Sequence, residues 1–219
     1  MALKVIQTAD GSSSLFHEGF QDHYHSIHGA LQESTHVFIR QGLDHISKKN
    51  ISLLEVGFGT GLNAYLTAVY AGEKRVHYTA IEKFPLADDT LHELNFPRLS
   101  GLKEHQDLFF RLHRASWDRD VDLQVHFTIR KVFADVTRYC FDRMFDLVYF
   151  DAFAPEKQPD MWGQRIFEKI FAAMHPGGIL VTYTSKGTVK RILQACGFIV
   201  EKIPGPPGKR HMLRAVKNI

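Results

Sequence analysis

The chain has 219 residues, of which 44% are hydrophobic and 23% are charged, and its formal net charge is +3. This composition is typical of a globular protein with one sizeable core, and it excludes a low-complexity chain. No apolar run approaches the roughly 20 residues that cross a bilayer, and the first residues lack the apolar core of a signal peptide. Two cysteines, Cys140 and Cys196, do not indicate a disulfide framework. We therefore expect a cytoplasmic protein that does not contact a membrane.

An N-terminal extension, residues 1–48, is expected to pack on the main domain, residues 49–219. Short strands are predicted at residues 5–7 and 14–16, on either side of an Ala-Asp-Gly-Ser turn. A helix is predicted to follow, from about Ser26 or Gly29 to His45. Because this helix leads into the bottom of the first strand of the main domain, its amino end is expected at the ligand face.

The most informative motif is LLEVGFGTGLN, residues 53–63, which predicts a buried strand, a glycine turn and the start of a helix. Gly57, Gly59 and Gly61 stand at alternate positions, so the backbone there can come close to a ligand. A dinucleotide fingerprint would place one more glycine inside the helix. Glu55, at the end of the strand, disfavours a diphosphate and favours the cationic methionine end of S-adenosyl-L-methionine.

A second strand, VHYTAIE at residues 76–82, also ends in an acid, Glu82. In an open parallel sheet, ligands bind at the carboxyl ends of the strands. Glu82 is therefore predicted to accept hydrogen bonds from the ribose hydroxyls of the same cofactor. The alternative is a glycine turn that binds no ligand, and this second motif counts against it.

Strands and helices alternate along the rest of the chain, with a helical insertion after the second strand. Further strands are predicted at residues 123–129, 144–151, 179–183, 198–203 and 211–216. This alternation predicts an α/β fold with a doubly wound, mostly parallel sheet of seven strands. Since only a Pro/Gly loop separates the last two strands, the last strand is predicted to be antiparallel.

Residues 145–155, FDLVYFDAFAP, predict a buried strand that ends at Asp151 and opens into a loop. Methyltransferases that act on exocyclic base amines usually carry two prolines at this place, which this chain lacks. An ionised carboxylate only accepts hydrogen bonds, so it suits an aliphatic amine that enters as a cation and must lose a proton before it attacks. Asp151 is therefore the predicted catalytic residue. The alternative is a turn-capping aspartate, which the nearby aromatic residues Phe153 and Trp162 disfavour.

Other polar residues allow more than one interpretation. Asp135 is a candidate acceptor for the adenine amino group or a simple helix N-cap. His23, His25 and His28 are residues of metal-binding type, but no fourth ligand is spaced nearby. We expect them to be loop histidines that face the substrate, and we expect no metal.

The C-terminal part of the chain is basic. From Lys186 onward it has eight Lys and Arg and one acid, Glu201, which gives this part a net charge of +7. That charge fits either a solvated face or a phosphate-rich partner. Loops that follow the predicted strands bring four residues to the ligand face: Tyr183, Ser185, Lys209 and Arg210.

Several of these motifs together resemble one family across nearly the whole chain. It is the methyltransferase family of the tRNA wobble-uridine enzyme that makes 5-methylaminomethyl-2-thiouridine, the MnmC N-terminal or MnmD type. The motifs that carry the resemblance are EVGFGTGLN at residues 55–63, IEKFPL at 81–86, DAFAP at 151–155 with PDMW at 159–162, YTSKG at 183–187 and GKRHML at 208–213. His211 departs from the family pattern, because an acid is usual after Lys-Arg.

The resemblance implies a Rossmann-like class I methyltransferase fold. It also implies N-methylation, by S-adenosyl-L-methionine, of the primary amine of 5-aminomethyl-2-thiouridine in the anticodon arm of tRNA. Cofactor-binding residues would be Glu55, Gly57, Gly59, Gly61, Asn63, Glu82, Lys83, Asp135 and Asp151. Substrate-binding residues would be Phe153, Trp162, Tyr183, Ser185, Lys209, Arg210 and Glu33.

The FAD-dependent oxidoreductase half of the bifunctional family members has no counterpart in this sequence. We therefore expect either a stand-alone methyltransferase or one domain of a longer protein, with the oxidoreductase acting earlier. Two other functions are compatible with the same fold. One is methylation of a small-molecule amine, and the other is a non-catalytic RNA-binding module.

Overall fold

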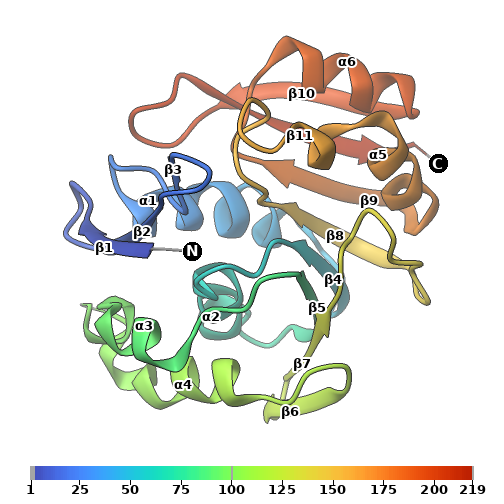
Figure 1. Cartoon of the computed structure of the whole chain (residues 1–219). Helices are drawn as coiled ribbons and strands as arrows, with labels where there is room; N and C mark the ends of the chain where they lie inside the picture. Colours follow the sequence, from blue (N-terminus) through green and yellow to red (C-terminus); the bar gives the residue numbers. More distant parts are fainter. Residues whose placement is uncertain (1–2, 100, 219) are drawn as a thin grey trace.

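The computed structural model describes residues 3–99 and 101–218. Its centre is a twisted eight-stranded sheet, in the order β10-β11-β9-β8-β4-β5-β7-β6 (Figure 1). The strands are β4 (Asn50–Val56), β5 (Arg75–Glu82), β6 (Asp120–Gln124), β7 (Phe127–Phe133), β8 (Phe145–Phe150), β9 (Met174–Thr182), β10 (Phe198–Pro204) and β11 (His211–Lys217). None of the helices in the described ranges is long and apolar enough to cross a bilayer.

Helices cover both faces of this sheet, which explains why the central strands are largely buried. Every residue of β8 is buried, as expected for a parallel strand with helices on both sides. One core forms against α1 (Ala30–Ser34), α2 (Leu62–Tyr70) and α4 (Gln106–Arg114). The other forms against α5 (Gln164–Ala172) and α6 (Gly187–Ala195). Short helices α3 (Asp88–Glu93), η3 (Phe96–Arg98), η4 (Lys103–His105) and η5 (Pro159–Trp162) lie in the connections.

The mostly parallel sheet and its antiparallel final pair are confirmed. Strand β4 pairs in parallel with β5 and β8, and these pair in parallel with β7 and β9. Strand β11 lies between β9 and β10 and is antiparallel to both. The carboxyl ends of the parallel strands therefore meet along one edge, as the sequence predicted for the ligand face.

The predicted number of strands was wrong, because residues 123–129 are not one strand. They span the turn of an antiparallel hairpin, β6–β7, which adds an eighth strand at the edge of the sheet. Apolar and polar residues alternate through this turn without a glycine or proline, so the pattern reads as continuous. Val125 at the tip is 84% exposed, which only the tertiary structure reveals.

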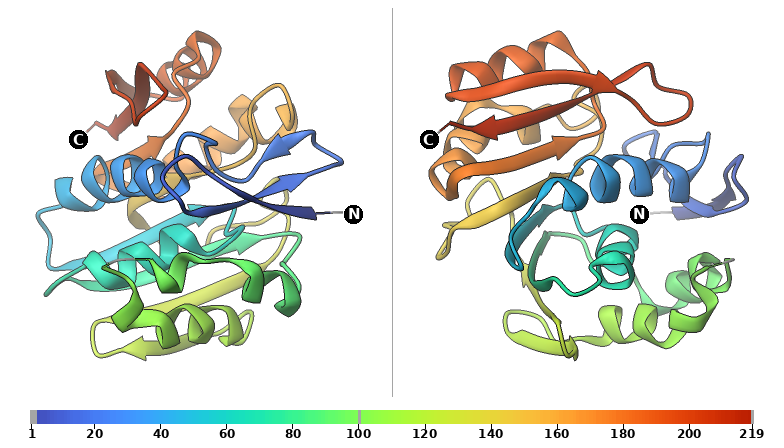
Figure 2. Two further views of the ribbon diagram at one scale, coloured as in Figure 1. Left: turned by 90° about the vertical axis from the view of Figure 1, so that its left-hand side faces the viewer. Right: turned by 180° about the vertical axis from the view of Figure 1, so that it is seen from behind.

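The N-terminal extension forms its own small antiparallel sheet of β1 (Leu3–Gln7), β2 (Ser13–His17) and β3 (Asp22–His23). The helix expected from Ser26 or Gly29 to His45 is not one continuous α-helix, and its start agrees with the second of these positions. Helix α1 begins only after Gly29, whose φ of 149° excludes most side chains. A turn of π-helix, η1 (Thr35–Arg40), and a 3₁₀ turn, η2 (Leu43–His45), follow it. This extension packs against the carboxyl edge of the sheet, where the loop between β10 and β11 also reaches it (Figure 2).

Candidate active site

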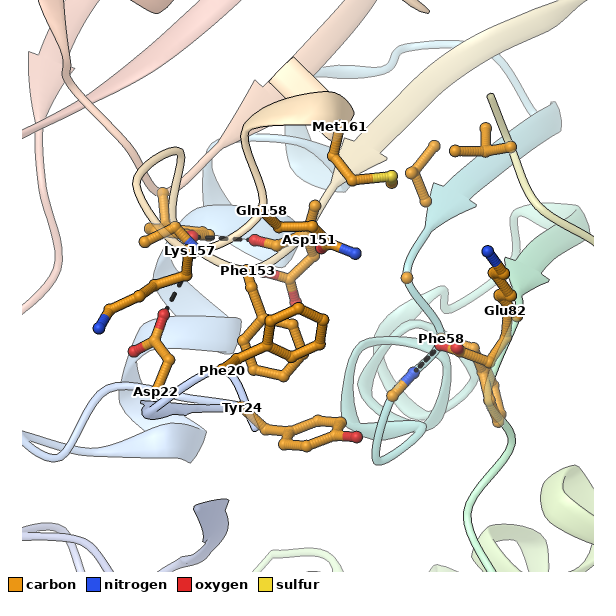
Figure 3. Close-up of a pocket in the computed structure, with 18 of the residues that line it drawn as sticks. Phe20, Asp22, Tyr24, Phe58, Glu82, Asp151, Phe153, Lys157, Gln158 and Met161 are labelled. Carbon is orange, nitrogen blue, oxygen red and sulfur yellow. Dashed lines mark hydrogen bonds between the residues drawn. The ribbon is translucent and has the colours of Figure 1, made fainter. Parts of the chain in front are cut away.

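A cavity of about 1780 Å³ opens at the carboxyl ends of the parallel strands. Its walls combine the glycine loop after β4, the residues after β5, β7 and β8, and the N-terminal extension. Figure 3 shows Glu82 on one side of this space and Asp151 with Phe153 on the other. Residues that lie far apart in the sequence therefore share one chamber.

The glycine loop has the backbone that the motif predicted. Gly57, Gly59 and Gly61 have φ values of 90°, 49° and 71°, in the left-handed region that glycine adopts without strain. A Cβ atom on Gly57 would lie 2.8 Å from the carbonyl oxygen of Asp151. Gly57 and Gly59 line the cavity, whereas Gly61 starts α2 and packs toward His113.

Glu82 connects the glycine loop to the end of β5. One carboxylate oxygen accepts a hydrogen bond from the backbone N–H of Gly59 at 3.1 Å, and the other accepts one from Phe84 at 2.7 Å. The side chain is only partly buried and lines the cavity. Because each carboxylate oxygen can accept more than one hydrogen bond, Glu82 retains the capacity to bind a diol.

Asn63 bridges two carboxyl groups at the base of the cavity. Its amide nitrogen donates to Glu55 at 3.0 Å and to Asp151 at 2.7 Å. Glu55 is completely buried and does not line the cavity. Burial, reinforced by the nearby Asp151, raises the pKa of Glu55 well above its usual value. Glu55 therefore supports Asn63 from behind the cavity wall, and its predicted preference for the cationic end of the donor stays a prediction.

Asp151 sits where β8 ends and faces the cavity. Desolvation raises its pKa to about 7, while the hydrogen bond from Asn63 acts in the opposite direction. Glu33 raises the pKa further and Lys209 lowers it. A carboxyl group with this pKa exchanges protons near neutral pH, which suits it to bind an ammonium group and to accept its proton.

Lys83 and Asp135 form an ion pair across the outer part of the cavity. Their charged atoms lie 2.9 Å apart, and both residues line the cavity. Hydrogen bonds from Thr137 and then from Lys83 lower the pKa of Asp135 to about 2. Asp135 also accepts the backbone N–H of Thr137 at 2.9 Å. It can therefore stabilise its own turn and still face the cavity as a candidate acceptor for the adenine amino group.

The predicted substrate residues divide into two groups. Glu33, Phe153, Tyr183 and Lys209 line the cavity, whereas Trp162, Ser185 and Arg210 do not. Trp162 is 3% exposed and donates a hydrogen bond to the carbonyl of Phe153 at 2.7 Å. It therefore holds the loop after β8 in place and does not face the substrate space.

Lys209 is engaged inside the cavity and is not a free surface cation. Its ammonium group pairs with Glu33, whose side chain is buried, and lies 4.2 Å from the centre of the Tyr183 ring. Tyr183 donates to the carbonyl of Ala152 at 2.9 Å. This chain of contacts joins the loop between β10 and β11 to the segment that carries Asp151.

Two histidines of the N-terminal extension have structural partners. His25 is 8% exposed, and its Nε2 lies 2.6 Å from the hydroxyl of Thr60 in the glycine loop. Burial lowers the pKa of His25 to about 4. His28 packs against Gly208. Among the described residues, no group of three or more His, Cys, Asp and Glu is arranged to hold a metal ion.

Three aromatic residues of the site were not predicted from any sequence motif. His17, Phe20 and Tyr24 line the cavity and surround Phe153. They come from the small N-terminal sheet, whose residues show no motif of their own. Only the way this sheet packs on the domain brings them to the site.

The fold and the site together define a methyl-transferring enzyme, and comparison with known proteins agrees. Residues 103–218 match the family described as S-adenosyl-L-methionine-dependent methyltransferase. The chain belongs to this family of S-adenosyl-L-methionine-dependent methyltransferases.

Its relatives point to a more particular group. The chain is 33% identical over 211 residues to the tRNA 5-methylaminomethyl-2-thiouridine biosynthesis bifunctional protein MnmC of Chromobacterium violaceum, covering 88% of this chain and 32% of that protein. It is 33% identical over 220 residues to MnmC of Methylobacillus flagellatus, covering 90% of this chain and 34% of that protein. The chain thus spans about a third of the length of these relatives. The crystal structure of MnmC2 from Aquifex aeolicus superposes with a TM-score of 0.82 at 27% identity, covering 98% of this chain and 70% of that one.

Proposed function

We propose that this chain methylates the primary amine of 5-aminomethyl-2-thiouridine at the wobble position of tRNA, giving 5-methylaminomethyl-2-thiouridine. The observation that supports this most directly is the placement of Asp151. It lies at the floor of a deep cavity, held by Asn63, with a pKa raised to about 7. The names of the MnmC relatives supply the substrate.

In this proposal, the donor occupies the side of the cavity formed by the glycine loop and Glu82. The left-handed glycines keep the loop free of side chains, and the carboxylate of Glu82 offers acceptors for a ribose diol. Lys83 and Asp135 line the same outer region. S-adenosyl-L-methionine, when bound, supplies an electrophilic methyl group on its sulfonium.

Asp151 performs the acid–base part of the reaction. An alkylamine resembles lysine and arrives protonated at neutral pH, and the protonated nitrogen has no lone pair for attack. The Asp151 carboxylate binds the ammonium, orients it and accepts its proton. Asn63 keeps the carboxylate in position through the 2.7 Å hydrogen bond.

Three further assignments belong to the same proposal. Residues 1–48 form an extension that completes the site, and residues 49–219 form the methyltransferase domain. A FAD-dependent oxidoreductase, fused or separate, acts earlier and exposes the primary amine. The anticodon arm of tRNA is the macromolecular partner, which agrees with the cytoplasmic location expected from the sequence.

A direct test incubates the protein with labelled S-adenosyl-L-methionine and tRNA that lacks the final methyl group, followed by nucleoside analysis. We expect label only in 5-methylaminomethyl-2-thiouridine. Label on free amines with none on tRNA would replace the proposal with a small-molecule enzyme. Binding of tRNA without any methyl transfer would indicate a non-catalytic module.

A further inference from the structure

Three aromatic side chains form one wall of the cavity beside Asp151. Phe20 and Tyr24 come from the N-terminal extension, and Phe153 comes from the loop after β8. The ring centroids of Phe20 and Phe153 are 4.8 Å apart, and those of Tyr24 and Phe153 are 5.0 Å apart. Figure 3 shows the three rings grouped between Asp151 and the glycine loop. We call Phe20, Tyr24 and Phe153 the aromatic wall.

Hydrogen bonds fix the backbone on both sides of this wall. The carboxylate of Asp22 accepts the backbone N–H of Ala154 at 3.4 Å, which ties the N-terminal sheet to the loop after β8. His17 Nδ1 accepts the N–H of Phe20 at 3.1 Å. The rings themselves are only half-buried, so they keep faces or edges open to the cavity while their backbones are held.

Tyr24 marks the boundary between two halves of the cavity. A Cβ atom on Gly59 would lie 3.1 Å from the Tyr24 ring, and the same ring packs edge-on against Phe153. One side of Tyr24 therefore belongs to the glycine loop, and the other belongs to the aromatic wall. The cavity volume of about 1780 Å³ exceeds the roughly 300–1,000 Å³ of a pocket for one small ligand. Space is available for a second ligand next to the donor.

We propose that the aromatic wall is a nucleobase site, which stacks the planar base that carries the reacting amine after it leaves an RNA loop. This inference rests on the proposed function and adds its substrate-recognition element. An enzyme that acts on a base takes it out of the stack and reads it in a pocket. Single-stranded RNA bases stack on aromatic side chains. A simple alkylammonium would gain cation–π attraction from the rings, but it has no planar face to stack on them, so dependence of binding on the base distinguishes the two ligands.

The proposal assigns a role to the N-terminal extension. Two of the three rings come from it, so the methyltransferase domain alone would have an incomplete base site. The proposal also predicts that RNA binding depends on the presence of the base, in addition to the contacts with phosphates that any RNA provides. This dependence separates stacking from the electrostatic attraction of a basic surface.

The test measures binding, so it does not depend on methyl transfer. Protein saturated with S-adenosyl-L-homocysteine is titrated into two fluorescently labelled anticodon stem-loops. One carries 5-aminomethyl-2-thiouridine at the wobble position, and the other is abasic there. Removing the base should weaken binding to the wild type by at least about tenfold, because it removes both the stacked base and the amine that Asp151 binds.

Variants of Phe20 then show whether the ring is responsible. Phe20→Leu should weaken binding of the intact stem-loop and should reduce its advantage over the abasic one, while the contact between Asp151 and the amine accounts for the part that remains. Phe20→Trp should retain most of the base dependence, because it restores a stacking face. Tyr70→Leu is the matched control, since Tyr70 is 48% exposed at the far end of α2, and it should behave as the wild type does.

Two outcomes would overturn the inference. One is equal binding of the intact and abasic stem-loops by the wild type, and the other is an undiminished base effect in Phe20→Leu. Affinity for S-adenosyl-L-homocysteine checks that each variant is folded, and Phe153→Leu replaces Phe20→Leu if that variant fails this check. Nucleoside analysis of the wild type is run alongside. Base-dependent binding without methylation would refute the proposed function but support the nucleobase site. Methylation without base-dependent binding would support the proposed function but refute the nucleobase site.

Discussion

At the scale of single residues, the site depends on the protonation of two carboxyl groups, those of Asp151 and Glu55. Asp151 and Glu55 share the amide of Asn63, yet one faces the cavity and the other is completely buried. Burial raises the pKa of both groups. The carboxyl group that can reach a substrate, Asp151, therefore titrates near neutrality, while burial favours the protonated form of Glu55.

We predict that Asp151→Asn lowers the single-turnover rate of methyl transfer a hundredfold or more, as expected for loss of a proton acceptor. Donor affinity should change little, because the glycine loop and Glu82 remain. In the wild type, the reactive carboxylate forms as pH rises through about 7, so the rate should increase there. The variant should lack this rise and recover partly at high pH, where more of the amine is neutral. An unchanged single-turnover rate would exclude the proposed role.

Glu55→Gln tests the neutral state of the buried carboxyl group. A buried acid whose pKa is raised binds its proton more tightly in the folded protein than in the unfolded chain. The wild type should therefore lose unfolding free energy as pH rises above about 4.5, by up to about 1.4 kcal/mol per pH unit from this group alone. Glu55→Gln should lose less over the same range, while the two proteins should be similar at pH 5. Urea denaturation at pH 5, 6.5 and 8 measures this, and parallel pH curves would refute it.

At the scale of elements, the loop between β10 and β11 has two different basic residues. Lys209 points into the cavity and pairs with Glu33 of α1, whereas Arg210 is exposed. The sequence assigned both residues to substrate binding. The structure gives Lys209 an intramolecular partner that holds the terminal loop against the N-terminal extension.

Single variants should separate these roles. Lys209→Ala leaves the buried Glu33 carboxylate without its cation and should cost about 1–3 kcal/mol of stability. The cost is smaller than for a fully buried ion pair, because the Lys209 side chain is 32% exposed and water screens the interaction. Lys209→Met combined with Glu33→Gln should recover most of that loss. Arg210→Ala should keep the melting temperature and flatten the log–log salt dependence of tRNA binding by roughly 0.7–0.9. If Lys209→Ala changes the salt slope without changing the melting temperature, the two assignments must be exchanged.

At the scale of the whole molecule, the cavity joins elements from nearly every part of the chain. The glycine loop after β4, Glu82 at the end of β5 and Asp151 after β8 all contribute to it. A ligand held by all of these segments stabilises the folded state as a unit, because it binds only when they are assembled. Donor binding should therefore be visible as a shift of global unfolding.

S-adenosyl-L-homocysteine at 100 times its Kd should add about 2.7 kcal/mol of stability. For a chain of this size, that corresponds to roughly 5–10 °C in melting temperature. Glu82→Ala removes charge-assisted hydrogen bonds worth about 1.5–3 kcal/mol each, so affinity should fall more than tenfold and the shift should shrink by half or more at the same ligand concentration. Glu168→Ala, an exposed carboxylate on α5, is the control. A full shift in Glu82→Ala would show that the ribose lies elsewhere.

The sequence by itself determined the parallel sheet, the glycine turn and the acids that end β5 and β8, because these depend on local pattern and on the rule that strand ends meet. It did not determine the β6–β7 hairpin, since its turn lacks glycine and proline and the alternation continues through it. It also did not show that Glu55 is enclosed, that Trp162 supports a loop, or that Lys209 pairs with Glu33. Those facts depend on which surfaces exclude water once distant segments pack together. The aromatic wall is the clearest case. Phe20 and Tyr24 lie near the N-terminus, far in sequence from Phe153, and the three rings meet only when the N-terminal sheet packs on the carboxyl edge of the central sheet.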